Sequence, residues 1–222
     1  MADDEIRFVP EPVAEIVGER SAARKKRTPK RPRKVTERYL RNVARWYVER
    51  YAPCSGQLRK ALMKRVDRGL REHGGDREEA VAWVEAVIAQ QIEIGAINDQ
   101  AYAHAWAASY HRRGVALYGI RQRLRAKRLS AAVIDAAMER LQAESEGDPA
   151  LAAACAYARR RRFGPFRALP AQREARAEKD LASMMRAGHR YDHVRRILAC
   201  PDMAAFDLLQ AEADGEPSWE GG

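Results

Sequence analysis

The sequence has few cysteines and no long apolar run. Its three cysteines, Cys54, Cys155 and Cys200, are widely spaced and odd in number, which indicates neither a disulfide framework nor a CxxC metal site. No apolar stretch approaches the roughly 18 residues of a transmembrane helix. The first residues are acidic and no apolar segment follows them, which argues against secretion. We therefore predict a cytoplasmic protein with reduced thiols and no membrane association.

Catalytic motifs are missing as well. The sequence contains no phosphate-binding Gly-rich loop with Lys-Ser/Thr, no nucleophile elbow and no acidic cluster suited to magnesium. His189 and His193 are four residues apart and Cys200 follows seven residues later, but a zinc site would need further ligands at suitable spacing. We therefore predict that the protein is not an enzyme and binds no cofactor or metal.

Strand patterns are also absent, and from Thr36 onward the apolar residues recur at helical spacing. The first stripe is Tyr39, Val43, Trp46 and Tyr47, which fall at i, i+4, i+7 and i+8. We expect most aromatic rings on such faces to pack in the core: Tyr39, Trp46, Trp83, Tyr102 and Trp106. Tyr118 and Tyr191 lie at helix starts among basic residues, where they could contact a partner.

Local start and stop signals divide these helices. Ser55 is expected to cap the second helix, and Asn98 or Asp99 the fourth. The glycines from Gly69 to Gly75 are expected to break the chain after the second helix. Asp148 and Pro149 form an N-cap and first-turn pair for a later helix.

The helical pattern repeats about every 60 residues. An offset of 62 aligns Leu58 with Ile120, Leu62 with Leu124 and Arg59 with Arg121. A further offset of 61 aligns Ile120 with Leu181, Leu124 with Met185 and Val133 with Val194. Because stacked repeats bury one face each, we predict an all-α fold, an elongated tandem array of three three-helix repeats at residues 36–97, 98–147 and 148–200.

Charge is abundant and unevenly distributed. The formal net charge is +10 and the pI is about 9.8, which points to an acidic partner such as nucleic acid, an anionic membrane or an acidic protein groove. The segment Arg24–Lys34 has eight basic residues in eleven. Self-repulsion in such a segment favours disorder, so we predict a disordered basic tail at 1–35 and, from its acidic composition, a C-terminal tail at 201–222.

The middle repeat carries the most informative basic pattern. Arg121, Arg125 and Arg128 fall at i, i+4 and i+7, with Arg123 and Lys127 beside them. Like charges at this spacing cost an isolated helix ~0.2–0.5 kcal/mol per pair, and no acidic residue lies between positions 114 and 129. An external anionic partner would offset this repulsion. The alternative is a solvated face, with some arginines paired to acids on neighbouring repeats.

A second cluster, Arg159–Arg162, could extend this surface into the third repeat. Four consecutive arginines point around most of a helical turn, so some are expected to pair with nearby acids such as Glu139 or Glu144. The guanidinium fork suits phosphate and carboxylate alike, so DNA and acidic protein both remain open as partners. The predicted partner-binding residues are Arg112, Arg113, Arg121, Arg123, Arg125, Lys127, Arg128, Arg159, Arg160 and Arg162.

Several phrases resemble a known family. IGAINDQAYAHAWAASYHRRG followed by YGIRQRLRAKRLSAAVIDAAMERL resembles the central repeat of the RecX regulatory proteins, and RRRRFGPFR with DLASMMRAGHRYDHVRRIL resembles their C-terminal part. Arg128 stands where that family often has a glycine. The resemblance implies a monomeric, non-enzymatic modulator that binds the RecA–DNA filament and restrains strand exchange, ATP hydrolysis and co-protease activity. The alternative is a helical-repeat protein that binds single- or double-stranded DNA, or RNA, without a recombinase partner.

Overall fold

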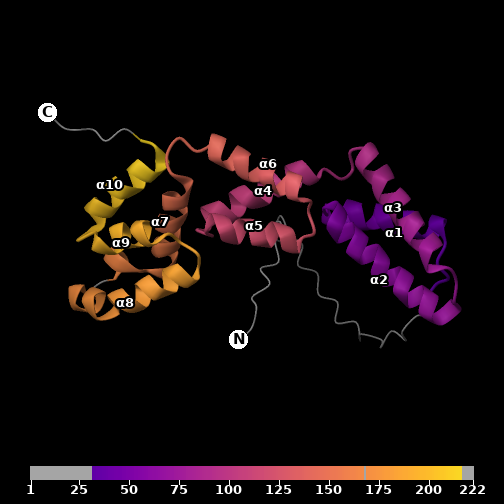
Figure 1. The fold of residues 1–222 in the computed structure, drawn as a ribbon, viewed down its shortest axis with the longest axis horizontal. Helices are drawn as coiled ribbons and strands as arrows, with labels where there is room; N and C mark the ends of the chain where they lie inside the picture. Colours follow the sequence, from indigo (N-terminus) through magenta and orange to yellow (C-terminus); the bar gives the residue numbers. More distant parts are fainter. Residues whose placement is uncertain (1–31, 168, 217–222) are drawn as a thin grey trace, which may run out of the picture. The chain divides into compact units, whose positions relative to one another are not determined.

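A computed structural model describes residues 32–167 and 169–216, and within these ranges the chain is helical with no strand (Figure 1). This confirms the all-α prediction, whereas the basic segment up to residue 31 lies outside the described residues. The helices are α1 (Glu37–Tyr51), α2 (Ser55–His73), α3 (Arg77–Glu93), α4 (Asp99–Arg112), α5 (Leu117–Ala126), α6 (Ala131–Ala143), α7 (Pro149–Arg161), the 3-10 helix η1 (Gly164–Phe166), α8 (Pro170–Arg186), α9 (Tyr191–Ala199) and α10 (Met203–Asp214).

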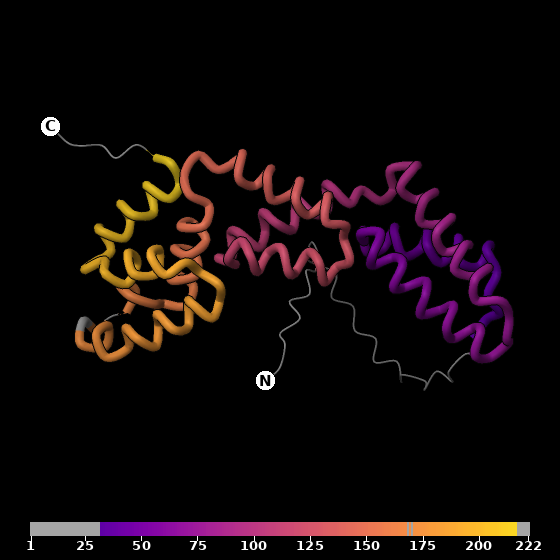
Figure 2. Tube along the Cα trace, in the orientation of Figure 1, coloured from indigo at the N-terminus to yellow at the C-terminus, as the bar shows by residue number. Residues whose placement is uncertain are grey.

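The helices form three units in chain order, and each unit has its own hydrophobic core. Figure 2 shows the chain passing through these units from indigo to yellow. The first unit packs α1 and α2 against α3, and the second packs α4 and α5 against α6. The third unit contains α7, η1, α8, α9 and α10. Each amphipathic helix therefore buries its apolar face against immediate sequence neighbours.

Side-chain caps set most of the helix starts. Thr36, Asn98, Ser130 and Asp148 each accept a hydrogen bond from a backbone N–H in the first turn of their helix. The expected cap at Ser55 is wrong by one residue. Cys54 occupies the N-cap position of α2, and the Gln57 side chain accepts from the Cys54 N–H at 3.2 Å.

The glycines in the first unit act differently from the sequence-based expectation. Gly69 is buried inside α2, which continues to His73 and ends at Gly74, where φ is +67°. A side chain at position 69 would collide with Val35, since a Cβ there would lie 2.5 Å from Val35 Cγ2. The predicted break is therefore confirmed at Gly74 and Gly75 and wrong at Gly69, which lies inside a longer second helix.

The register between the first two units agrees with the offset of 62 residues. Leu58, Leu62, Ile120 and Leu124 are all fully buried. In both units an arginine at the start of the second helix also pairs with an acid on the third helix. These ion pairs are Arg59–Glu85 and Arg121–Asp135.

The offset of 61 for the third unit is wrong by one residue. Met184 is fully buried whereas Met185 is 39% exposed, so Met184 occupies the position of Leu124. The turn after each helix confirms an offset of 60, because Arg128 and Gly188 both have positive φ, +63° and +91°. Apolar spacing alone did not distinguish two adjacent methionines.

The third unit extends beyond residue 200. We predicted an acidic tail from residue 201, but α10 packs on α7 and places Phe206 fully inside the third core. Leu209 and Ala213 on the same helix are also buried, and Asp202 caps its first turn. Asp207, Glu212 and Asp214 lie on the exposed side of this packed helix, which composition alone did not reveal.

Candidate partner-binding surface

Two cations, Arg123 on α5 and Lys127 directly after it, lie over aromatic rings of α4. Tyr102, Trp106 and Tyr110 follow one another at spacings of four residues, and their rings form a stack with centroids 6.0 and 5.3 Å apart. The Arg123 guanidinium lies 5.2 Å from the centre of the Tyr110 ring, and the Lys127 ammonium lies 5.4 Å from that of Trp106. Cation–π contacts of this kind are worth roughly 0.5–2 kcal/mol, which offsets repulsion within α5.

The predicted stripe of Arg121, Arg125 and Arg128 divides into two parts. Arg121 is half-buried and pairs with Asp135 on α6. Arg125 and Arg128 are exposed and have no ion pair or side-chain hydrogen bond within the described part of the chain. A partner therefore has direct access to Arg125 and Arg128, whereas it would compete with Asp135 for Arg121.

The backbone at Arg128 is itself unusual. Its φ of +63° lies in the left-handed region, where a non-glycine residue is disfavoured by roughly 1–2 kcal/mol. The first turn of α2 packs on it closely, since a Cβ on Gly56 would lie 2.5 Å from the Lys127 carbonyl oxygen and 2.7 Å from Arg128 Cβ. Arg128 is thus placed where the first and second units meet.

Three further contacts join the first and second units. The Asp99 carboxylate accepts hydrogen bonds from the Ser55 N–H at 2.8 Å and from the Ser55 hydroxyl at 2.5 Å. Cys54 belongs to the second hydrophobic core, although it precedes α2. Burial raises the pKa of its thiol. Sequence reasoning missed this junction because it treated Asp99 and Ser55 as caps of their own helices.

The end of α4 lies against the middle of α7. Gly114 has φ +72° and sits so close to Ala153 and Tyr157 that a Cβ there would collide with the Tyr157 backbone. This contact places Arg112, which is exposed, and Arg113, which is half-buried, beside α7. Glycine is therefore required at position 114 for both its conformation and its close approach.

The arginines of α7 are also arranged over aromatic rings. Arg159 lies 5.5 Å from the Phe206 ring centre and 3.9 Å from an Asp207 carboxylate oxygen, and Arg160 lies 5.7 Å from the Tyr157 ring centre. The partner of Arg159 is therefore Asp207 and not Glu139 or Glu144. Arg162 is exposed and ends the helix with φ +56°.

Glu144 has other partners. It accepts hydrogen bonds from Arg140 and His104, both at 2.7 Å, and the Arg140 hydrogen bond, followed by that of His104, lowers the pKa of its carboxyl. The structure thus brings the ten predicted residues into two groups, one on α4 and α5 and one on α7. The assignment of these residues to a partner remains a prediction.

The aromatic residues depart from expectation at one position. Tyr39, Trp83, Tyr102 and Trp106 pack against the cores as predicted, but Trp46 is 50% exposed. Tyr118 and Tyr191 are also exposed, at 68% and 49%. No helix among the described residues is long and apolar enough to cross a bilayer.

Comparison with known proteins finds relatives that share one family name. The family model for the second three-helix domain of RecX matches residues 98–138. Regulatory protein RecX of Myxococcus xanthus is 42% identical over 176 residues, which cover 79% of this chain and 92% of that protein. Regulatory protein RecX of Agrobacterium fabrum is 26% identical over 171 residues, covering 77% and 88%. That of Streptomyces coelicolor is 39% identical over 87 residues, covering 39% and 46%. No solved structure gives a significant match.

Proposed function

The chain belongs to the RecX family of regulatory proteins, and from this premise we propose that it binds the RecA–DNA filament and inhibits it. The restrained activities would be strand exchange, ATP hydrolysis and co-protease function in DNA repair and the SOS response. The proposal implies a cytoplasmic, non-enzymatic protein that acts by occupying the filament.

The observation that carries the proposal is the basic surface of the unit matched by the family model. Arg125 and Arg128 are exposed without an acidic partner in the described chain, while Arg123 and Lys127 are held on aromatic rings. Ordered cations lose less side-chain entropy when they bind. An anionic filament surface, protein or DNA, fits this arrangement.

The test is the single-strand-dependent ATPase of RecA, titrated with the full chain. We expect wild-type protein to lower the rate at or below stoichiometric ratios, and the double variant Arg125→Glu/Arg128→Glu to lose most of this effect. Arg45→Glu/Lys60→Glu is the matched control, because both residues are exposed on the first unit and the change in net charge is the same. An unchanged ATPase at saturating wild-type protein would refute the proposal.

The second candidate is a nucleic-acid-binding protein without a recombinase partner, favoured by the net charge of +10. It predicts tight binding to naked DNA or RNA with an affinity that falls steeply with salt, because neutralised phosphates release counterions. Binding measured with and without RecA at two salt concentrations separates the two candidates. If RecA does not increase the affinity of the chain for nucleic acid at the higher salt concentration, the result supports the second candidate.

A further inference from the structure

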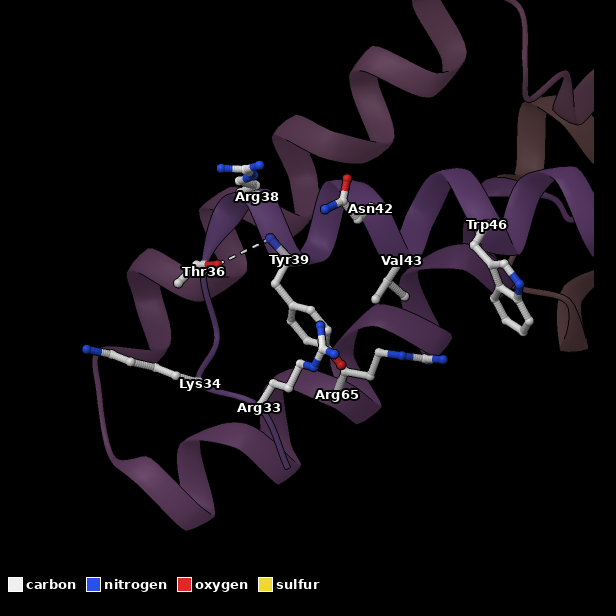
Figure 3. A pocket seen from close by; sticks show the side chains of 9 residues that line it. All are labelled: Arg33, Lys34, Thr36, Arg38, Tyr39, Asn42, Val43, Trp46 and Arg65. Atoms are coloured by element: carbon white, nitrogen blue, oxygen red, sulfur yellow. Dashed lines mark hydrogen bonds between the residues drawn. The ribbon is translucent and has the colours of Figure 1, made fainter. Parts of the chain in front are cut away.

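The first unit contains a basic pocket that the surface above does not include. Its volume is about 430 Å³, within the range of roughly 300–1,000 Å³ typical of ligand sites. Four of its lining residues are cationic, two are aromatic and none is acidic. The lining residues are Arg33, Lys34, Thr36, Arg38, Tyr39, Asn42, Val43, Trp46 and Arg65 (Figure 3).

Residues 32–35 precede α1 and are anchored to α2, so the predicted disordered tail at 1–35 is wrong for these four residues. Val35 is buried in the first core, and the Pro32 carbonyl oxygen lies 2.8 Å from the His73 ring nitrogen Nε2. Gly69 allows this approach, since a Cβ there would lie 3.0 Å from the Arg33 carbonyl oxygen. The backbone that carries Arg33 is therefore held in place beside α1 and α2.

One face of α1 forms the aromatic side of the pocket. Tyr39, Val43 and Trp46 follow at i, i+4 and i+7. The Tyr39 ring packs partly on the core, whereas Trp46 is half exposed and touches Tyr51 edge to face at 5.8 Å. An indole in this position adds little to core packing and leaves ring surface open to a ligand.

Among the described residues, no acid pairs with the cations of the pocket. Arg33 and Arg38 make no ion pair or side-chain hydrogen bond within the described residues, and Arg65 donates only to the Ala61 carbonyl oxygen, at 3.0 Å. Other arginines of the same unit do have acids, as in the Arg41–Glu37 and Arg77–Asp67 pairs. The pocket thus concentrates positive charge that no acid in residues 32–167 or 169–216 neutralises by an ion pair.

Figure 3 shows how these side chains lie. Arg33 extends toward the Tyr39 ring, and Arg65 extends along α1 toward Trp46. Lys34 and Arg38 point outward from the rim of the pocket. Two guanidinium groups and two rings therefore line the same pocket beside α1.

We propose that this pocket binds single-stranded nucleic acid, with phosphates at Arg33 and Arg65 and a base stacked on Trp46. Proteins that bind single strands combine a cationic track for the backbone with aromatic side chains on which bases stack. One guanidinium group can donate hydrogen bonds to two oxygens of the same phosphate. An acidic peptide would satisfy the cations but has no need of the exposed indole. The site does not depend on the proposed filament function.

The stacking contact is tested with a labelled oligothymidylate and the full chain, without RecA, by fluorescence anisotropy. We expect Trp46→Ala to weaken binding roughly tenfold, with unchanged circular dichroism because the side chain is half exposed. Tyr118→Ala is the control, since it removes an exposed ring from the second unit, 68% exposed against 50% for Trp46. Equal affinity of Trp46→Ala and wild type would overturn the proposal.

The phosphate contact is tested by charge reversal on the same scaffold. We expect Arg33→Glu to weaken binding more than Arg45→Glu, an exposed α1 residue outside the pocket, and to reduce the slope of log K against log salt by about 0.7. Equal losses in the two variants would refute a localised site.

A competition experiment with polyglutamate tests the alternative ligand. If polyglutamate displaces the oligonucleotide, and if its affinity is the same for Trp46→Ala and wild type, the pocket binds an acidic peptide instead. Loss of oligonucleotide binding alongside intact RecA inhibition would separate this site from the filament surface.

Discussion

At the scale of single residues, His189 shows how the third unit differs from the second. With the offset of 60 residues, His189 stands where the second unit has Leu129, and both side chains are buried. The His189 ring packs 4.9 Å from the centre of the Tyr157 ring, and its Nε2 has no hydrogen-bond partner among the described residues. Burial, with a smaller contribution from His193, lowers the pKa of His189 to about 4.

This shift makes stability depend on pH. Since the folded pKa lies below the unfolded value of about 6.5, the unfolded chain binds more protons between those values, and stability falls as pH decreases from about 6.5 toward 4. We expect a loss of about 2 kcal/mol at pH 5 from this residue, which His189→Leu should remove. Denaturant unfolding of both proteins at pH 7.5 and pH 5 measures the difference. A variant with the same pH dependence as wild type would contradict the assignment.

Individual residues also mark the limits of sequence reasoning. Trp46 fits an apolar helical stripe as well as Tyr39 does, but the helices of the described residues leave half of it exposed. Met184 and Met185 are equally apolar, and only packing against α9 and η1 shows which one is buried. Periodicity defines the apolar face of a helix to within about one residue. Which residue at the edge of that face is buried depends on where the neighbouring helix packs.

At the scale of helices, the units are joined where helix ends pack on one another. The first turn of α2 carries Gly56, which faces the carbonyl oxygen of Lys127 after α5. The sequence shows a glycine at position 56 but not why a side chain is excluded there, because residues 56 and 127 are distant along the chain. Their contact depends on how two units meet.

Two glycine substitutions with unequal expected costs test this junction. Gly56→Ala should destabilise the protein by about 1–3 kcal/mol, because the added methyl would overlap backbone that cannot move freely. Gly119→Ala is the control within α5, where the nearest atom is the Val115 side chain at 3.1 Å. Alanine there meets only a side chain, so it should change stability by less than about 1 kcal/mol, because the gain in helix propensity over glycine offsets the shift of Val115. Chemical denaturation measures both, and equal effects would argue against a close junction.

Helix α10 supplies the second element-scale prediction. Phe206 is fully buried and packs edge to face on Phe166 at 4.7 Å, whereas Leu208 on the same helix is 69% exposed. Phe206→Ala should cost about 3–5 kcal/mol, and Leu208→Ala should change stability by less than about 0.5 kcal/mol. Unfolding curves and hydrogen exchange in α7 and α9 provide the measurement. A mild effect of Phe206→Ala would indicate that this segment is a tail after all.

At the scale of the molecule, charge and local surface have different roles. The net charge of +10 attracts any polyanion over long distances, so it governs association rates and their salt dependence. The residues that touch the partner govern dissociation instead. Most arginines of the described units are exposed or stacked on rings, so net charge alone does not identify a binding site.

Binding kinetics on the RecA filament separate these roles. Arg125→Glu and Arg45→Glu change net charge equally, so we expect both to slow association by a similar, modest factor that disappears at high salt. Arg125→Glu alone should accelerate dissociation, by roughly tenfold for a contact worth about 1.4 kcal/mol. Surface plasmon resonance at two salt concentrations measures both rates. Matching dissociation rates for the two variants would exclude α5 from the contact.

The amino-acid sequence by itself determined the helical class, the first repeat offset, most caps and the family, because these depend on local spacing and on residues close along the chain. The scarcity of cysteine and the lack of catalytic motifs are likewise properties of the sequence itself. Tertiary structure alone decided the helix at the C-terminus, the pairing of Arg121 with Asp135, the burial of Cys54 in the second core and the exposure of Trp46. Each of these depends on contacts between distant segments, whose partners no local pattern specifies.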